Sequence, residues 1–397
     1  MESEAAAGAA QGEGDLLHQF ERILHDDPLI DEVGFLHPTQ LDSLLAGGAN
    51  TSQHFWCSDH KLAVSTDVLP DLYRAARRAH SDAALNAPSP PASAAALIMT
   101  HSKALLILCP DLLTAWNSRK KVLSVNYDLK HLKDELQLCA LILSYSPKNE
   151  STWCHRRWVI TKLAQHIQDM SELIDSESLL VKQIAEKSKM NYRAWRHRCW
   201  LIPFMKPEQV LDELNKSVKW TELHVADNCC FHYRRSLLLA LLDSHGVENG
   251  NDSLYLQSDA HLMWKEELRW NEMLIRRYQG RESLWIHRRF LSQWWLQQLI
   301  NSEETCPSKE EESLADLFLA QEIHLLSDCL IAPSDEFGET GVQAGLAALY
   351  TLWISKQDAV VKEKVEERLQ QSVGSLKEVL ARVSWDKSRL WTQLLHC

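Results

Sequence analysis

Hydrophobic positions along this chain follow a helical period, and one pattern recurs five times. Each copy has a large aromatic residue, here called the anchor, and an arginine three positions later; four copies add an aliphatic residue at position seven. Offsets of zero, three and seven share one face of a helix, so ring, guanidinium and aliphatic group should point the same way. The anchors are Trp116, Trp153, Trp195, Phe231 and Trp285. The arginines are Arg119, Arg156, Arg198, Arg234 and Arg288.

A second pattern precedes the anchors. In four of the five copies a glutamate lies 18 residues before the anchor, and these are Glu135, Glu177, Glu213 and Glu267. Helix-capping residues lie four before three anchors, at Asn149, Asn191 and Asp227. Pro110 and Pro147, six before their anchors, indicate where the preceding helix has ended. Each copy is therefore predicted to be a helical hairpin of roughly 36 to 42 residues.

Stacked hairpins explain how such a chain builds a core. One hairpin cannot bury its apolar face alone, whereas stacked hairpins bury their apolar faces against one another and form a continuous core. Residues 49–245 contain no glycine, which disfavours the tight turns of β-hairpins and favours helices. We therefore predict an all-α fold, a right-handed α-α superhelix, or solenoid, of stacked helical hairpins.

Five segments follow from the same patterns. Residues 1–14 are small and acidic and are expected to be a disordered tail. Residues 15–94 are expected to form an N-terminal helical segment that ends in a Pro- and Ser-rich linker. The five repeats occupy 95–300, an acidic loop 301–313, and helices that close the solenoid 314–397.

The repeated arginines need partners. An isolated buried charge is costly, so an arginine on the same face as a buried ring requires a carboxylate or backbone carbonyls. The anchors are interpreted as structural wedges between layers. Our hypothesis is that the glutamates 18 residues before the anchors pair with the arginines, within a hairpin or with the neighbouring one.

Cysteines and histidines near the anchors raise two other possibilities, a zinc site and a Cys-His catalytic pair. The residues concerned are Cys154, His155, His197, Cys199, Cys229, Cys230 and His232. Their spacings lack the paired signature of a closed zinc site. They also recur by repetition, so no single pair is distinguished as a nucleophile and its base. We expect no metal on this chain.

Composition and charge exclude two classes of partner, nucleic acids and membranes. The chain has 42 basic and 54 acidic residues, and a net charge of -12 opposes binding to a phosphate backbone, so nucleic acid is not expected. No apolar run approaches the roughly 18 residues needed to cross a bilayer, so membrane insertion is not expected. Ten cysteines without a CxxC pair, and an N-terminus without a secretory signal pattern, predict a reduced, cytoplasmic protein.

The repeats resemble those of protein prenyltransferase α subunits. "SPKNESTWCHRRWVI" (146–160) and "MNYRAWRHRCWLI" (190–202) carry the resemblance, which extends over about residues 105–295. The first and fourth copies are more similar to the Rab geranylgeranyltransferase α subunit than to the farnesyltransferase one. In this family the α subunit is a crescent of hairpins that embraces a β subunit, which holds zinc, the isoprenoid diphosphate and most of the chemistry.

The resemblance implies a function and two candidate catalytic residues. In the family, a basic residue and a tyrosine of the third repeat reach the rim of the partner's active site. Tyr192 matches the tyrosine, whereas the basic position holds Met190, with Lys189 one residue earlier. Lys148 and Asn149 match in the second repeat, where a structural role is expected.

The chain is thus expected to be the α-type subunit of a heterodimeric protein geranylgeranyltransferase. Its β subunit, most plausibly of the Rab type, would transfer a geranylgeranyl group from its diphosphate to a C-terminal cysteine of target proteins. Zinc and geranylgeranyl diphosphate are expected on the β subunit, and no cofactor on this chain. The alternative is a noncatalytic helical-repeat interaction scaffold.

The pairing hypothesis makes a prediction for the third and fourth repeats. Arg198→Met and Glu213→Gln should each lower the melting temperature clearly, because each removes a charge that buried neighbours require. Differential scanning calorimetry checks this, and wild-type melting in both variants would contradict the hypothesis.

Overall fold

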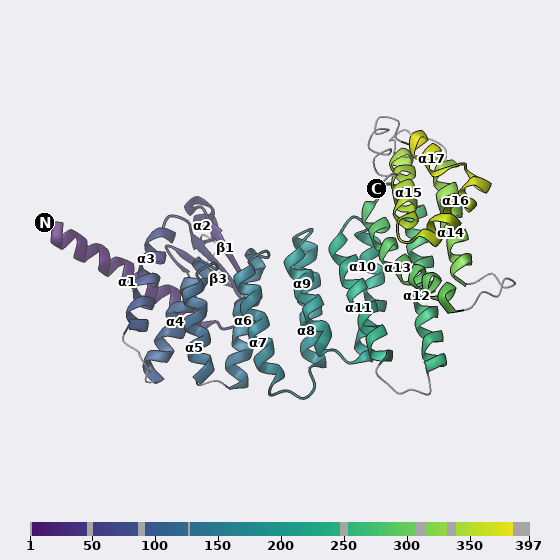
Figure 1. The fold of residues 1–397 in the computed structure, drawn as a ribbon. Helices are drawn as coiled ribbons and strands as arrows, with labels where there is room; N and C mark the ends of the chain where they lie inside the picture. Colours follow the sequence, from purple (N-terminus) through teal and green to yellow (C-terminus); the bar gives the residue numbers. More distant parts are fainter. Residues whose placement is uncertain are drawn as a thin grey trace. The chain divides into compact units, whose positions relative to one another are not determined.

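The computed structural model describes residues 2–45, 51–85, 92–125, 128–246, 253–305, 314–331 and 339–383. It divides into two compact units, Met1–Met205 and Lys206–Cys397. Helices dominate both units (Figure 1), and the all-α helical-repeat class expected from the sequence is confirmed.

The first unit begins with helices around a small sheet and continues as helical hairpins. Its first elements are α1 (Glu2–Asp26), β1 (Glu32–Leu36), α2 (Pro38–Leu45), β2 (Thr51–Ser52), β3 (Phe55–Ser58), β4 (Lys61–Ser65) and α3 (Leu69–Leu85). The rest are α4 (Ala92–Leu108), α5 (Leu113–Val125), α6 (Leu129–Tyr145), α7 (Glu150–Ala164), α8 (Ser171–Lys187), α9 (Tyr192–Leu201) and the 3-10 turn η1 (Ile202–Phe204).

The hairpins of the first unit stack in two layers. Helix α4 pairs with α5, α6 with α7 and α8 with α9; α4, α6 and α8 also pack in sequence, as do α5, α7 and α9 (Figure 1). Each anchor lies on the second helix of its hairpin, as the capping and proline signals predicted. The side chains of Asn149 and Asn191 cap α7 and α9 by accepting from the backbone N–H three residues later.

A four-stranded sheet with the order β1-β4-β3-β2 interrupts the N-terminal helices. Strands β1 and β4 are parallel, and β3 is antiparallel to both β4 and β2. The sheet belongs to the same core as α1, α3 and α4. Phe55 stacks on Phe20 of α1 at 5.6 Å between ring centroids, and Phe35 meets Tyr145 of α6 edge-on at 5.5 Å.

This sheet corrects the expectation that residues 15–94 are helical up to the linker. The β3–β4 hairpin lies inside the glycine-free stretch, where tight turns were disfavoured. Its turn residues Asp59 and His60 adopt positive φ angles of 50° and 61°, which asparagine, aspartate and histidine tolerate better than most residues. The His60 ring is held 2.9 Å from Asp27, so a side-chain contact supports a turn that glycine usually makes.

The N-terminus also differs from expectation. Residues 1–14 were expected to be a disordered tail, but α1 begins at Glu2. Alanine and glutamate have high helix propensity, and here they outweigh the glycines. The Glu13 carboxylate is paired with Arg74 and Arg78 of α3, which ties this helix to the first unit.

The second unit consists of further hairpins. Its elements are α10 (Pro207–Leu223), α11 (Asn228–Gly246), α12 (Ser253–Arg277), α13 (Glu282–Thr305), α14 (Leu314–Ile331), α15 (Glu339–Ser355), α16 (Ala359–Ser372) and α17 (Leu376–Val383). Helix α13 continues to Thr305, so residues 301–305 of the expected acidic loop are helical, and residues 306–313 lie outside the described residues. Within 314–383 the expected C-terminal helices are present. No helix within the described ranges is long and apolar enough to span a membrane.

Candidate functional site

The five anchor rings are buried, each exposing at most 2% of its surface. The indole N–H groups of Trp116 and Trp153 donate to the carbonyl oxygens of Pro110 and Pro147, at 2.8 and 3.1 Å. The proline lies just after the preceding helix, so its carbonyl oxygen has no partner within that helix. The indole N–H supplies the missing hydrogen bond. The predicted role of the anchors as wedges fits this burial.

Three arginines of the pattern pair with the glutamate of the following hairpin. Arg156 on α7 donates from Nε and Nη2 to the two carboxylate oxygens of Glu177 on α8, at 2.7 and 2.5 Å. Arg234 on α11 binds Glu267 on α12 in the same way, at 2.9 and 2.5 Å. Arg119 on α5 binds Glu135 on α6 with both nitrogens as well. Such two-point contacts fix geometry as well as charge.

The third guanidinium nitrogen, Nη1, donates to the first helix of the arginine's own hairpin. Nη1 of Arg156 donates to the carbonyl oxygen of Leu136 on α6 at 2.6 Å, and Nη1 of Arg234 to that of Leu214 on α10 at 2.7 Å. One arginine therefore joins three helices: its own, the first helix of its hairpin, and the first helix of the next hairpin. We call this repeated arrangement the arginine–glutamate ladder.

Histidines complete the ladder. Two residues after their anchors, His155, His197 and His287 bring Nε2 within 2.8 to 2.9 Å of Glu135, Glu177 and Glu267. Each ring also packs on the preceding described anchor, with centroid distances of 4.4 to 5.1 Å. In the fourth repeat Tyr233 takes this place and donates its hydroxyl to Glu213.

The electrostatics follow from this pairing. Burial alone would raise the pKa of Glu135, Glu177 and Glu267, but the guanidinium and the histidine N–H outweigh it and lower the pKa of all three to about 2. Burial lowers the pKa of His155, His197 and His287 despite the adjacent carboxylates. The three imidazoles are therefore neutral at pH 7. Their buried Nδ1 atoms have no hydrogen-bond partner, which fits a proton on Nε2.

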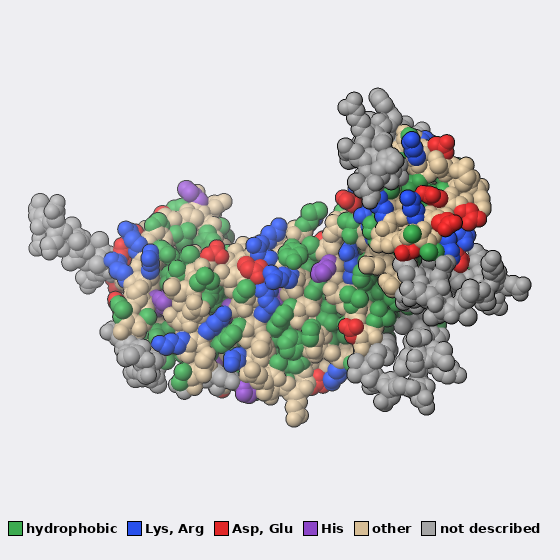
Figure 2. Space-filling model, in the orientation of Figure 1, with side chains coloured by type: hydrophobic (Ala, Val, Ile, Leu, Met, Phe, Trp, Pro, Cys, Tyr) green, Lys and Arg blue, Asp and Glu red, His purple; other side chains and the backbone are tan. Residues whose placement is uncertain are grey.

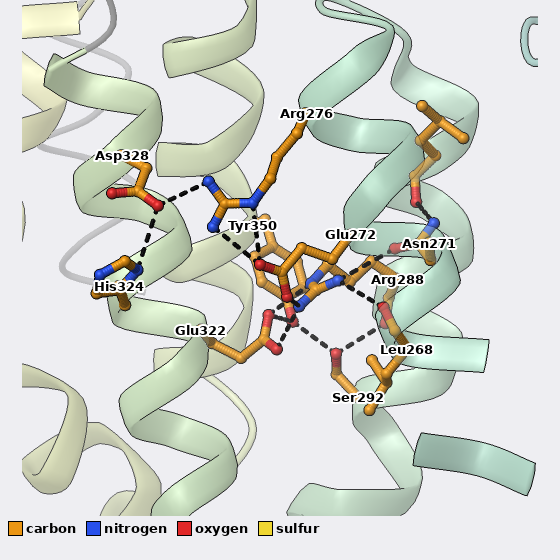
Figure 3. A network of polar contacts seen from close by, with 11 residues as sticks. Leu268, Asn271, Glu272, Arg276, Arg288, Ser292, Glu322, His324, Asp328 and Tyr350 are labelled. Atoms are coloured by element: carbon orange, nitrogen blue, oxygen red, sulfur yellow. Dashed lines mark hydrogen bonds and ion pairs between the residues drawn. The ribbon is translucent and has the colours of Figure 1, made fainter. Parts of the chain in front are cut away.

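The ladder ends in the C-terminal helices with a different set of residues (Figure 3). Arg288 on α13 donates from Nε and Nη2 to Glu322 on α14, both at 2.7 Å. The Tyr350 hydroxyl, from α15, lies 2.7 Å from Glu322 and 2.5 Å from the Ser292 hydroxyl. Sequence reasoning missed Glu322 and Tyr350, because no anchor follows Glu322 to set the 18-residue register.

Along the sequence, the division between the two units falls between the third and fourth repeats. Arg198 on α9 and Glu213 on α10 are both buried, as the other members of the pattern are. Their pairing stays a prediction from the sequence.

The cysteines and histidines near the anchors are spread over several helices. Within the part of the chain that the structure describes, no group of three or more His, Cys, Asp or Glu residues could hold an ion. His155 and His197 are instead engaged by ladder glutamates. Burial raises the pKa of the Cys230 thiol, so a Cys-His nucleophile is not supported there.

The two candidate catalytic residues lie at the surface. Lys189 lies in the turn between α8 and α9, Tyr192 is the first residue of α9, and Tyr192 is 60% exposed. Asn149 is the cap of α7 and also donates from Nδ2 to Asp111 at 2.7 Å, which confirms its expected structural role.

Basic side chains surround one carboxylate beside this turn. Glu150 accepts from Arg157 at 2.8 Å and from Arg193 at 3.1 Å, and Arg196 lies 3.8 Å from it. Figure 2 shows a group of Lys and Arg side chains over α7 and the neighbouring α9. Because three guanidinium groups share one carboxylate, this surface has an excess of positive charge.

Comparison with known proteins agrees with the geometry. Residues 132–163 match the family model "Protein prenyltransferase alpha subunit repeat". They cover most of α6 and α7, with the anchor Trp153 and the ladder residues Glu135 and Arg156. Residues 132–163 are thus similar to one such repeat. The resemblance stated from the sequence is therefore confirmed.

Two relatives are named after this repeat. The chain is 30% identical over 254 residues to Protein prenyltransferase alpha subunit repeat-containing protein 1-B from Xenopus laevis, covering 53% of this chain and 58% of the relative. It is 31% identical over 239 residues to the Homo sapiens protein 1 of that name, covering 50% and 58%. It thus spans somewhat more than half the length of these relatives.

A more distant similarity links the repeat to an enzyme subunit. The chain is 23% identical over 257 residues to the Homo sapiens Geranylgeranyl transferase type-2 subunit alpha, covering 62% of this chain and 40% of that protein.

The ladder predicts a specific response to acid. The glutamates are ionised in the folded chain down to a pKa of about 2, against an ordinary 4.5, so their stabilisation is complete above about pH 4.5. It is lost as the pH falls toward 2. The buried histidines act in the same direction, because unfolding lets them take up protons below their ordinary pKa of 6.5.

Urea unfolding between pH 5 and 3 measures this. Near pH 3 the free energy of unfolding should rise with pH by about 1.4 kcal/mol per unit for each such glutamate. Glu177→Gln should reduce that slope by about one glutamate's share. Glu172→Gln, at an exposed position on the same helix, should leave it unchanged. Equal slopes in both variants would contradict the assignment.

Proposed function

We propose that this chain is the α-type subunit of a heterodimeric protein geranylgeranyltransferase. The observation that carries the proposal is the prenyltransferase alpha subunit repeat, supported by similarity to the type-2 geranylgeranyl transferase alpha subunit. In such an assembly a partner β subunit of the Rab type holds zinc and geranylgeranyl diphosphate. Its protein substrates end in cysteine, and the complex acts in the cytoplasm.

The chemistry of this chain's own residues supports such a division of labour. Buried arginine, glutamate and histidine side chains of the ladder bind one another and are inaccessible to a substrate. By contrast, Lys189 in the α8–α9 turn presents an exposed ammonium group, and Tyr192 at the start of α9 presents an exposed phenol. Both can donate hydrogen bonds to an anionic leaving group, which gains negative charge as the isoprenoid carbon separates from it.

Lys189 is one residue removed from the position that the resemblance assigns to the basic residue. Its side chain has four methylene groups and is exposed, so the ammonium can reach past its own backbone position. We assign it the role of binding the diphosphate, and Tyr192 the role of orienting it.

The proposal predicts that the full chain forms a stable heterodimer with a prenyltransferase β subunit. Co-expression with Rab-type, farnesyltransferase-type and type-1 geranylgeranyltransferase β subunits, followed by size-exclusion chromatography with light scattering, measures the complex. We expect a one-to-one complex with the Rab-type subunit, and transfer of labelled geranylgeranyl from its diphosphate to proteins that end in cysteine.

Variants distinguish a catalytic contribution from assembly. Lys189→Ala should lower kcat by about tenfold or more, because a donor to the leaving group is lost, while the complex still forms. Lys182→Ala, also exposed and on α8, is the matched control and should leave kcat unchanged. If no β subunit forms a complex, or a complex transfers no prenyl group, the proposal is wrong and a noncatalytic scaffold is favoured.

A further inference from the structure

A second row of aromatic side chains follows the helices that hold the anchors. The aromatic residue five positions after an anchor stacks on the buried ring two positions after it, with centroid distances of 5.5 to 6.3 Å. These pairs are Trp158 on His155, Trp200 on His197 and Phe290 on His287. Trp353 stacks on Tyr350 of α15 in the same way, although the anchor position there is Ala348. We call Trp158, Trp200, Phe290 and Trp353, which are all half-buried, the outer rings.

In the second unit, a guanidinium group of the preceding hairpin lies over each of two outer rings. Arg235 on α11 lies 5.9 Å from the ring centre of Phe290 on α13, and Arg289 on α13 lies 5.8 Å from that of Trp353 on α15. Both arginines come four positions after their anchors, so they occupy equivalent places in neighbouring repeats. A ring attracts a cation at this distance, and the guanidinium N–H groups can still donate to a carboxylate.

These two arginines lack the carboxylate that their sequence neighbours have. Arg234 and Arg288 each bind a ladder glutamate through two nitrogens. Arg235 and Arg289 form neither an ion pair nor a hydrogen bond with any part of the chain that the structure describes, and the Nε atom of each is buried. A cation withdrawn from water without a matching anion is costly to the fold.

Arg235 illustrates this imbalance most clearly. Burial lowers the pKa of its guanidinium group, because it disfavours the charged form. Its Nη1 and Nη2 atoms, unlike Nε, are not buried and are therefore open to a molecule from solution. A partly desolvated guanidinium with free donors binds a carboxylate more strongly than a fully hydrated one does.

The second repeat shows the same position with a partner. Arg157 donates from Nη2 to Glu150, seven residues earlier on α7, at 2.8 Å. In the fourth repeat the position of Glu150 is Asn228, and in the fifth Glu282 forms no ion pair with Arg289 within the described residues. The second unit thus presents two guanidinium groups without the carboxylate that Arg157 has.

We infer that Arg235 and Arg289 bind two carboxylates of an acidic peptide segment of a partner protein. Packed helices lie about 8–10 Å apart, which sets the separation of equivalent positions on α11 and α13. A polyproline II segment advances about 9 Å in one turn of three residues, so acidic residues three apart, as in Glu-Pro-Pro-Glu, match this separation. The inference goes beyond the proposed function and does not depend on it, because both arginines belong to this chain alone.

The inference predicts that two adjacent arginines differ in their effect on stability. Arg234→Met should lower the melting temperature of the full chain by about 5 °C or more, because buried Glu267 loses its partner. Arg235→Met should leave the melting temperature unchanged or raise it, because it removes a desolvated charge that no carboxylate matches. Differential scanning calorimetry measures both. A comparable loss in Arg235→Met would give Arg235 a structural role and overturn the inference.

Fluorescence anisotropy of a labelled peptide made of Glu-Pro-Pro repeats measures binding to the isolated full chain at 0.15 M salt. We expect saturable binding that weakens as salt is added, and a Kd about tenfold or more higher in Arg235→Met and in Arg289→Met. Arg269→Met, at an exposed position on α12, is the matched control for loss of one positive charge and should leave the Kd unchanged. The corresponding Gln-Pro-Pro peptide should not bind.

Three results would overturn the inference. They are no binding of the Glu-Pro-Pro peptide, an unchanged Kd in Arg235→Met and Arg289→Met, and an equal rise of the Kd in Arg269→Met. Binding of a phosphoserine-Pro-Pro peptide but not of the Glu-Pro-Pro peptide would also overturn it and would indicate a phosphopeptide site instead. Because no β subunit is present in these measurements, they fail or succeed separately from the proposed function.

Discussion

The structure depends on satisfying charged side chains inside a helical stack. A buried guanidinium is tolerated only when its donors and its charge are matched, and one-sided removal of such a partner is strongly destabilising. The ladder meets this condition by contact between hairpins. Arg156 binds Glu177 of the next hairpin, the Leu136 carbonyl completes its donors, and His197 fills a remaining acceptor of Glu177. Neighbouring hairpins are thereby held in one register.

This constraint separates structural from functional residues. Residue types that elsewhere perform acid–base chemistry or bind metals are here engaged with one another and buried. The surface at the α8–α9 turn differs, because Lys189, Met190 and Tyr192 are exposed and contribute little to the core. The candidate functional residues therefore lie at or beside a turn between helices. The ladder holds these helices in place, but its own side chains are not among the candidates.

Sequence reasoning succeeded where the period repeated and failed where it did not. The fixed offsets of Arg156 and Glu177 from their anchors predicted the ladder, although the sequence left open whether pairing occurs within or between hairpins. No anchor follows Glu322 in the sequence, so its pairing with Arg288 could not be predicted. The small sheet was missed because its strands are short and its turn, Asp59–His60, lacks glycine.

A double-mutant cycle on Arg156 and Glu177 tests the central claim that coupled ion pairs join the hairpins. Arg156→Met, Glu177→Met and the double variant are compared by urea unfolding near pH 7. Each single change should lower the free energy of unfolding by about 3–5 kcal/mol, because it leaves a buried charge unpaired. The double variant should lose much less than the sum of the two. Additive losses would contradict the claim, since they would mean that the two side chains stabilise the chain independently.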